Sequence, residues 1–133
     1  MVGYPKIEDL PRTLFIDIDG TLIDHKGNVD EVCAGLDAVG LLPGVREKIN
    51  EWLLRGDQII LTTGRRESLR AITLAQLNRL AIPFDVLLMG VSRGERILIN
   101  DKKPYSDAYV ASAIVLERDK GFIGTKDCWG REF

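Results

Sequence analysis

The stretch Thr13-Leu-Phe-Ile-Asp-Ile-Asp-Gly-Thr21 decides how this chain is interpreted. Residues 13–18 are almost continuously apolar, which predicts a buried β-strand, and Asp19-Gly20 ends the strand with a turn signal. Asp17 and Asp19 stand two residues apart, so both carboxylates lie on one face if the strand continues straight. Two carboxylates this close can hold a divalent cation, or one can act as nucleophile and the other as proton donor.

The rest of the chain alternates between helix-like and strand-like segments. A short helix is predicted after a cap at Asn28, a second helix opens at Pro43 and ends at Gly56, and a third covers 66–80. Further apolar strands are predicted over 58–63, 84–88, 96–99 and 111–117. This alternation predicts an α/β fold, a Rossmann-like three-layer sandwich with a central parallel sheet of about five strands covered on both faces. The 133 residues suit a single domain over 1–133.

The composition limits the classes of function. The formal net charge is −2 and there is no long basic run, so binding of nucleic acid through a basic surface is not indicated. No apolar run reaches the length of a membrane span, and residues 1–14 lack the charged start and apolar core of a signal peptide. The two cysteines, Cys33 and Cys128, suit a reducing compartment. We therefore expect a cytoplasmic protein without a membrane partner.

Polar residues follow three of the predicted strands at the point where each strand ends. In open parallel sheets, ligands bind beyond the carboxyl ends of the strands. Thr63, before Gly64, offers a hydroxyl and backbone N–H groups to a phosphate near the start of the predicted third helix. The residues expected to converge at this edge are Asp17, Asp19, Thr63, Gly64, Asn100 and Asp101.

Three of these segments match a known family in the expected order. Asp17-x-Asp-Gly-Thr21 after an apolar strand resembles the first motif of the haloacid dehalogenase superfamily of phosphatases. Ile60-Leu-Thr-Thr-Gly64 resembles the second motif, and Ile97-Leu-Ile-Asn-Asp101 resembles the fourth. The spacing between the motifs leaves no room for the cap domain of larger members. The resemblance therefore implies a small capless hydrolase, a phosphoric monoester phosphatase.

The resemblance also implies roles for individual residues. Asp17 would form an aspartyl-phosphate, Asp19 would serve as general acid and base, and Thr63 would hold the phosphoryl oxygens. The third-motif cation would be Arg93, with Arg96, Lys102 and Lys103 as rivals. Mg²⁺ would be held by Asp17, by the carbonyl oxygen of Asp19 and by Asp101, with Asn100 as a possible ligand and Asp107 as a further candidate. The phosphate would also contact Ile18, Gly20, Thr62, Gly64, Arg65 and Lys102, although a solvated helix start is an equal alternative for Arg65.

The substrate and the partners are less specified. An open site suits a bulky phosphorylated macromolecule, whereas a loose likeness to polysaccharide-pathway phosphatases favours a sugar phosphate. Alternatively, a second copy of the chain covers the site by docking on an apolar stripe formed by Val29, Val32, Cys33, Leu36 and Val39. Two other functions stay open: a family member that binds a ligand without turnover, and a receiver domain that accepts phosphate on aspartate. The receiver domain fits less well, because both aspartates follow one strand.

Overall fold

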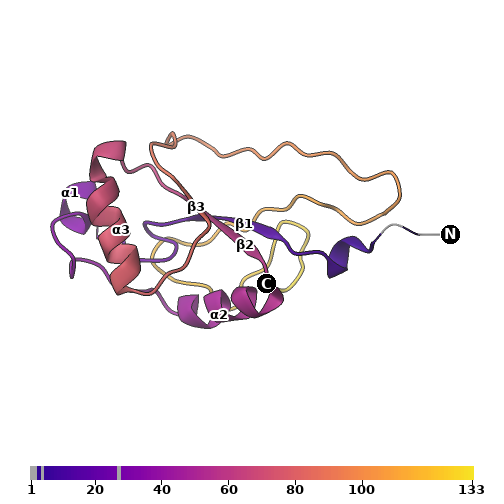
Figure 1. The fold of residues 1–133 in the computed structure, drawn as a ribbon, viewed down its shortest axis with the longest axis horizontal. Helices are drawn as coiled ribbons and strands as arrows, with labels where there is room; N and C mark the ends of the chain where they lie inside the picture. The colour runs from indigo at the N-terminus through magenta and orange to yellow at the C-terminus, as the bar shows by residue number, and fades with distance from the viewer. Residues whose placement is uncertain (1–2, 4, 27) are drawn as a thin grey trace.

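The fold is a small α/β structure, seen in a computed structural model that describes residues 3, 5–26 and 28–133 (Figure 1). Its sheet consists, in the described residues, of three parallel strands in the order β1-β2-β3. The strands are β1 (Thr13–Asp17), β2 (Gln58–Thr62) and β3 (Val86–Leu88). The helices are α1 (Val29–Val32), α2 (Val45–Arg55) and α3 (Arg70–Arg79), with short 3₁₀ turns η1 (Ile7–Asp9) and η2 (Glu67–Leu69).

The register of the sheet places the ends of β1 and β2 side by side. Ile16 pairs with Leu61, and Asp17 pairs with Thr62. The buried face of the sheet carries alternate residues of each strand, including Ile16, Ile59, Leu61 and Leu87. Because Asp17 and Thr62 end neighbouring parallel strands, the residues that follow them emerge at one edge, as the sequence predicts.

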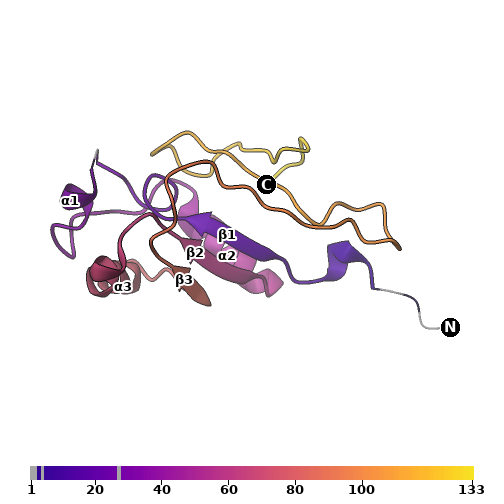
Figure 2. The ribbon, with the colours of Figure 1, turned by 90° about the horizontal axis from the view of Figure 1, so that it is seen from above.

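Helix α2 covers the buried face of the sheet (Figures 1 and 2). Val45, Ile49 and Trp52 are its buried residues. The predicted cap at Gly56 is confirmed, since Gly56 has a left-handed φ of 77° and its N–H bonds to the carbonyl of Leu53. This helix therefore contributes Trp52, the largest of the fully buried side chains among the described residues.

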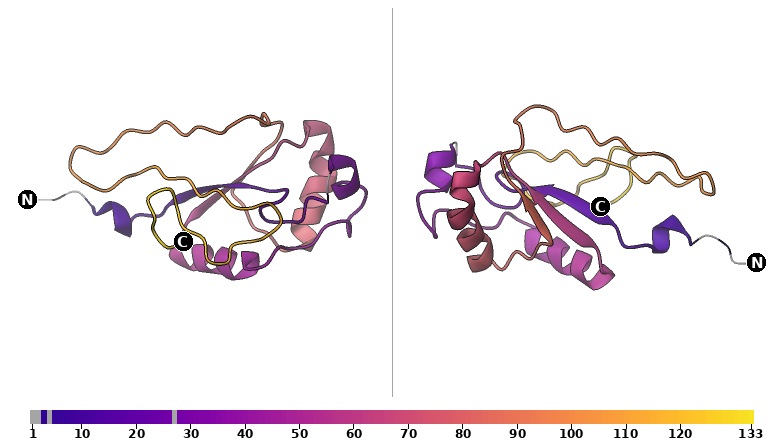
Figure 3. Two further views of the ribbon diagram at one scale, coloured as in Figure 1. Left: turned by 180° about the vertical axis from the view of Figure 1, so that it is seen from behind. Right: turned by 45° about the horizontal axis from the view of Figure 1, so that its top comes forward.

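The prediction of five strands and three layers is wrong for the described residues. The segments 96–99 and 111–117 run as chain without strand structure, and together they form part of the long C-terminal run in Figure 3. Ile99 is 90% exposed and Val115 is 93% exposed. The face of the sheet opposite α2 is also open, since Phe15 is 55% exposed. An apolar pattern indicates strand propensity, but pairing depends on a partner far away in the sequence.

The first and third helices also differ from expectation. The third helix begins at Arg70 instead of residue 66, after an extended Arg66 and the turn η2. Its buried residues are Thr73, Gln76 and Leu77, so its inner side is not the apolar surface expected. Helix α1 is a single turn, although Asn28 does cap it by accepting a hydrogen bond from the Glu31 N–H at 2.8 Å.

The proposed docking stripe contributes mainly to the chain's own core. Val32 and Val39 are buried, and Cys33 packs partly buried against the core. Leu36 is 44% exposed, and the side chain of Val29 lies outside the described residues. The stripe therefore leaves little apolar surface for a second copy of the chain.

The C-terminal run contacts α2 through Phe122 and Phe133, with a tight backbone crossing at Phe122. The Phe122 N–H donates to the Pro43 carbonyl at 3.0 Å, and the Phe122 ring packs edge-on against Trp52 at 5.6 Å between centroids. Gly121 has a φ of +82°, and a Cβ at this position would lie 2.0 Å from the Pro43 oxygen. Only glycine fits this crossing.

None of the helices in the described part of the chain has the length and apolar character of a membrane span.

Candidate active site

A polar cleft of about 520 Å³ opens beyond the carboxyl ends of β1 and β2. Its walls come from the segments that follow all three strands and from the region of α1. The side chains that line it are mostly charged, and five of them are arginines. The lining residues are Asp17, Asp19, His25, Asn28, Asp30, Thr63, Gly64, Arg65, Arg66, Arg93, Arg96 and Arg118.

Asp17 presents an accessible carboxylate to the cleft. Its side chain is 37% exposed; Oδ2 accepts a hydrogen bond from the Thr21 hydroxyl at 3.1 Å, and Oδ1 lies 3.9 Å from the Arg96 guanidinium. Burial raises the pKa of Asp17 above its ordinary value, and the Thr21 hydrogen bond and the charge of Arg96 offset only part of this rise. The nearby charge of Asp19 adds to the rise. An accessible oxygen beside a guanidinium is suited to attack on an anionic substrate.

The carboxylate of Asp19 is held by the buried guanidinium of Arg65. Arg65 Nε donates to Asp19 Oδ2 at 2.9 Å, and Arg65 Nη2 donates to Asp19 Oδ1 at 2.8 Å. The Arg65 side chain has no exposed surface, and the Asp19 side chain is 12% exposed. A carboxylate has about four lone-pair positions, so each oxygen keeps one for water or substrate. Asp19 is therefore fixed in orientation, with one acceptor position left on each oxygen.

The remaining donors of Arg65 tie this pair to helix α3. Arg65 Nη1 donates to Thr73 Oγ1 at 3.0 Å and to Gln76 Oε1 at 2.8 Å. Gln76 in turn donates through Nε2 to the carbonyl oxygens of Val32 and Gly35, at 2.7 and 2.9 Å. The polar residues on the inner side of α3 thus satisfy one buried arginine, as a buried charge requires. The sequence analysis expected Arg65 at the phosphate or in solvent, and the structure commits four of its N–H groups to the protein.

Thr63 lies where the sequence predicts it, at the end of β2 and in the wall of the cleft. It is 1% exposed, and its hydroxyl accepts a hydrogen bond from the Arg65 N–H at 3.0 Å. The Val91 N–H donates to the Thr63 carbonyl at 3.0 Å, which fixes the segment after β3 against the segment after β2. Because α3 begins only at Arg70, the anion site expected at its first turn is not formed beside Thr63.

Several predicted site residues lie outside the cleft. Asp101 pairs with Lys103 at 2.8 Å, and this hydrogen bond holds the pKa of Asp101 below its usual range. Lys102 lies 5.3 Å from the ring centroid of Tyr109. The Ile18 side chain is buried in the core. Residues predicted for the site that do not line the cleft are Ile18, Gly20, Thr62, Asn100, Asp101, Lys102, Lys103 and Asp107.

Among the rival third-motif cations, Arg93 and Arg96 both reach the cleft. Of these, Arg96 is the one that comes within 4 Å of Asp17. Arg93 lies beside Gly64, where a Cβ would be 4.0 Å from its Cγ. The geometry therefore favours Arg96 as the partner of the nucleophile, in place of the first choice, Arg93.

Arg118 was not predicted as a site residue, but it lines the cleft and lies against the turn after β1. A Cβ at Gly20 would come within 2.9 Å of Arg118 Cγ. The Asp119 N–H donates to the Gly20 carbonyl at 2.9 Å, and Asp119 Oδ1 accepts from the His25 N–H at 2.8 Å. A signal was present, since Arg118 directly follows the segment 111–117 that was predicted as a strand. The rule that polar residues after strands reach the site would have included it.

The residues of the cleft fit a Mg²⁺ site with few protein ligands. Mg²⁺ is commonly held by one or two carboxylates together with water and substrate phosphates. Asp17 would supply a carboxylate and the Asp19 carbonyl oxygen a second ligand, whereas Asn100 and Asp101 do not line the cleft. The described residues contain no group of three or more histidine, cysteine, aspartate or glutamate side chains that could hold a metal ion. A role for Asn100 and Asp101 as ligands stays a prediction that this geometry does not support.

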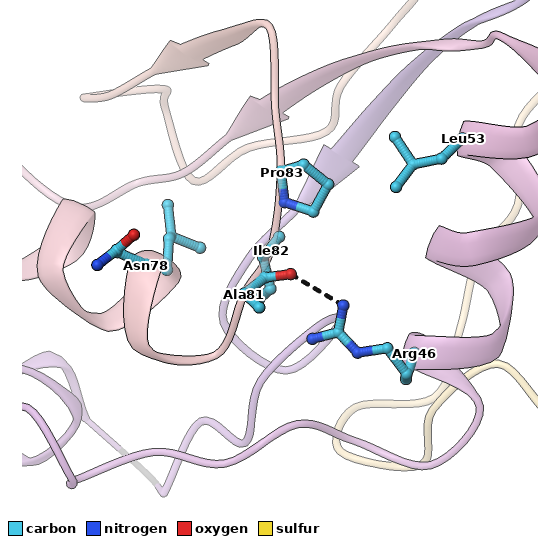
Figure 4. A pocket seen from close by; sticks show the side chains of 7 residues that line it. Arg46, Leu53, Asn78, Ala81, Ile82 and Pro83 are labelled. Carbon is cyan, nitrogen blue, oxygen red and sulfur yellow. Dashed lines mark hydrogen bonds between the residues drawn. The ribbon is translucent and has the colours of Figure 1, made fainter.

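A second, apolar hollow lies between α2 and the end of α3 (Figure 4). Leu53, Ile82 and Pro83 line it, and the Arg46 guanidinium donates to the Ala81 carbonyl at its edge at 2.8 Å. Arg46 also donates to the Leu80 carbonyl. These contacts close the end of α3 and bring no nucleophile or acid to the hollow, so we assign the chemistry to the polar cleft.

Comparison with solved structures finds two related chains. A chain of the Pnkp1/Rnl/Hen1 complex is 28% identical with a TM-score of 0.53, and the match covers 66% of this chain and 31% of that chain. A chain of the Pnkp1/Rnl/Hen1 RNA repair complex is 27% identical with a TM-score of 0.53, over 70% of this chain and 30% of that chain. This chain therefore spans less than a third of the length of either.

A Vibrio cholerae protein is similar at 20% identity with a TM-score of 0.44, over 67% of this chain and 79% of that chain. No family model and no curated protein matches the chain. The comparisons thus relate part of this fold to components of an RNA repair complex.

Proposed function

We propose that the chain is a Mg²⁺-dependent phosphomonoester hydrolase of the haloacid dehalogenase type, with Asp17 as the nucleophile. The observation that carries the proposal is the accessible Asp17 carboxylate at the end of β1, in a cleft lined by Thr63 and five arginines. A carboxylate nucleophile within a cationic wall suits attack on a phosphoryl group. The two unpaired cysteines agree with a cytoplasmic site of action.

The reaction then proceeds in two displacements. An Asp17 oxygen attacks phosphorus and the bond to the leaving oxygen breaks, while Asp19 donates a proton to that oxygen. Water next attacks the aspartyl-phosphate, Asp19 takes its proton, and phosphate leaves Asp17. Arg96 and Thr63 hold the phosphoryl oxygens and balance charge. Asp17 and the Asp19 carbonyl oxygen would hold Mg²⁺, which would supply neutralisation of charge on the phosphoryl group.

The substrate is a phosphorylated small molecule or a phosphorylated macromolecule. The similarity to chains of an RNA repair complex favours a phosphorylated nucleic-acid end over the sugar phosphate suggested by the sequence. It also favours partner proteins in place of a second copy of this chain. The overall charge of −2 opposes general affinity for nucleic acid, so recognition would be confined to the cleft.

The test measures phosphate release from sugar phosphates, nucleotides and oligonucleotides with a terminal phosphate, in Mg²⁺ and in chelator. We expect metal-dependent release in the wild type and none in Asp17→Asn. Asp30→Asn is the matched control, since Asp30 lines the same cleft without a role in the reaction. Equal release by Asp17→Asn would remove Asp17 as nucleophile.

A second candidate is a protein that binds phosphorylated ligands without turnover. It is favoured by the position of Asp101 outside the cleft and by the tight pairing of Asp19 with Arg65. Binding of the same compounds without release from any of them, by folded protein in Mg²⁺, would establish this alternative.

A further inference from the structure

The side chains of three arginines in the cleft have no partner within the described part of the chain. Arg65 is committed to Asp19, and Arg96 approaches Asp17. Across the described residues, the side chains of Arg66, Arg93 and Arg118 form no hydrogen bond or ion pair. Uncommitted guanidinium groups gathered around one cleft indicate an anionic ligand, because like charges repel unless a partner neutralises them.

These three side chains reach the cleft from three different segments. Arg66 follows β2 and Arg93 follows β3, while Arg118 lies over Gly20 after β1. Backbone hydrogen bonds fix the segments, from the Gly90 N–H to the Arg65 carbonyl at 2.8 Å and from the Asp119 N–H to the Gly20 carbonyl at 2.9 Å. The arginines therefore surround the cleft from several sides instead of forming a run on one exposed helix.

The cleft holds more cationic groups than the reacting phosphoryl group engages. Of its five arginines, Arg65 pairs with Asp19 and Arg96 lies beside Asp17, so Arg66, Arg93 and Arg118 remain, together with the single further carboxylate of Asp30. His25 adds a buried Nδ1 atom without a hydrogen-bond partner in the described part of the chain. A volume of about 520 Å³ leaves room for a ligand of nucleotide size.

We propose that Arg66, Arg93 and Arg118 form a second anion subsite, and that the substrate carries a second phosphate group beside the one that is removed. That the ligand is a substrate rests on the proposed phosphatase function. The second anion subsite itself is tested by binding alone. The second group is a phosphomonoester in a small bisphosphate or a phosphodiester in a nucleic-acid strand. Both present anionic oxygens that guanidinium groups bind through paired hydrogen bonds.

The test is calorimetric binding to the wild-type chain in chelator, where no phosphate is released. The probes are adenosine 3′,5′-bisphosphate and the two corresponding monophosphates. We expect the bisphosphate to bind about tenfold more tightly than either monophosphate, since a charge-assisted hydrogen bond accounts for about a factor of ten. A dinucleotide with a terminal phosphate shows whether a diester serves as the second group.

Single variants assign the subsite to its residues. Arg66→Gln, Arg93→Gln and Arg118→Gln should each reduce the preference for the bisphosphate by about three- to tenfold while the monophosphate affinities change less than about twofold. Arg131→Gln, which alters a charge in the C-terminal turn, should leave the preference unchanged. Equal binding of bisphosphate and monophosphates, or equal weakening of both in the variants, would overturn the subsite.

The two proposals fail in different ways. A bisphosphate preference without phosphate release from any compound would remove the phosphatase and leave the subsite. Release from monophosphates without a bisphosphate preference would remove the subsite and leave the phosphatase.

Discussion

The Arg65 guanidinium makes two parallel hydrogen bonds to the Asp19 carboxylate from a position with no exposed surface. Such a pair adds geometric specificity as well as charge, because the planar fork matches both carboxylate oxygens. Its other donors reach Thr73 and Gln76 on α3. Arg65 is thus a positioning residue for Asp19, the group we propose as proton carrier.

Replacement of Arg65 should affect catalysis and stability to different degrees. Arg65→Gln leaves Asp19 without its charge partner and should reduce the free energy of unfolding by about 3–5 kcal/mol, as for other broken buried pairs. Arg65→Lys keeps the charge but loses the fork, so it should recover part of that stability while kcat stays about 10- to 100-fold low. Denaturant unfolding and kcat measured over pH separate the two effects.

A double-mutant cycle tests whether the two residues act together. Asp19→Asn alone should lower kcat by about 10²–10⁴. If Arg65 acts through Asp19, adding Arg65→Lys to Asp19→Asn should cost little further activity. Independent, additive losses would assign Arg65 a role apart from Asp19.

The buried pairing of Arg65 shows what the sequence could and could not predict. The strand before Asp17, the strand before Thr63 and the helix closed by Gly56 were predictable, because each has an apolar pattern and a boundary signal within a few residues. The contact between Arg65 and Asp19 joins residues 46 positions apart. Its one local sign was the polar pair Thr73 and Gln76, which stand three residues apart on the inner side of the predicted helix.

The segments at 96–99 and 111–117 show the converse limit. Both have the composition of strands, but Ile97 is 73% exposed and Val115 is 93% exposed in the structure. A strand-like composition indicates that the residues fit a pleated, half-buried surface. It does not show that another strand lies beside them to pair with. The prediction that Asp101 reaches the site depended on such a neighbour, and without that strand Asp101 does not line the cleft.

Asp57 should make stability depend on acid pH. Burial alone raises its pKa, but hydrogen bonds from the Arg12 side chain and backbone, with the charges of Arg12 and Arg55, outweigh burial and hold the pKa below its usual range. Arg12 donates to Asp57 through N, Nε and Nη2, at 2.9, 3.1 and 2.7 Å. Because the folded pKa is depressed, the stabilisation is complete above the unfolded value of about 3.9 and is lost as pH falls through the folded value.

Asp57→Asn tests this dependence. The variant should unfold about 1.5–3 kcal/mol more easily than the wild type at pH 7, since its hydrogen bonds lose their charge. The difference should shrink as pH falls below about 4, because the wild-type carboxyl then becomes protonated as well. Urea unfolding at pH 7, 5 and 3 measures it, and a difference that stays constant over this range would contradict the assignment.

Gly121 and Gly124 offer a matched pair for the crossing that fastens the C-terminal run. Both have positive φ values, +82° and +67°, but a Cβ at Gly121 would lie 2.0 Å from the Pro43 oxygen, whereas none is met at Gly124. Gly124→Ala should cost about 1–2 kcal/mol of backbone strain. Gly121→Ala should cost about 1–3 kcal/mol beyond that, because Pro43 is displaced. Equal thermal unfolding of the two variants would show that the crossing is absent in solution.

Asp101 provides a test of the metal site. It pairs with Lys103 away from the cleft, so the structure leaves the Asp17 carboxylate as the charged ligand available to Mg²⁺. Loss of a residue that supports a metal site commonly costs about 10- to 100-fold in metal affinity, so we expect Asp101→Asn to leave the Mg²⁺ concentration for half-maximal phosphate release within about twofold of wild type. Lys103→Gln, which removes the partner of Asp101, should likewise have no effect. A rise of tenfold or more in Asp101→Asn would place its carboxylate at the metal and would mean that the chain after Arg96 folds into the cleft during turnover.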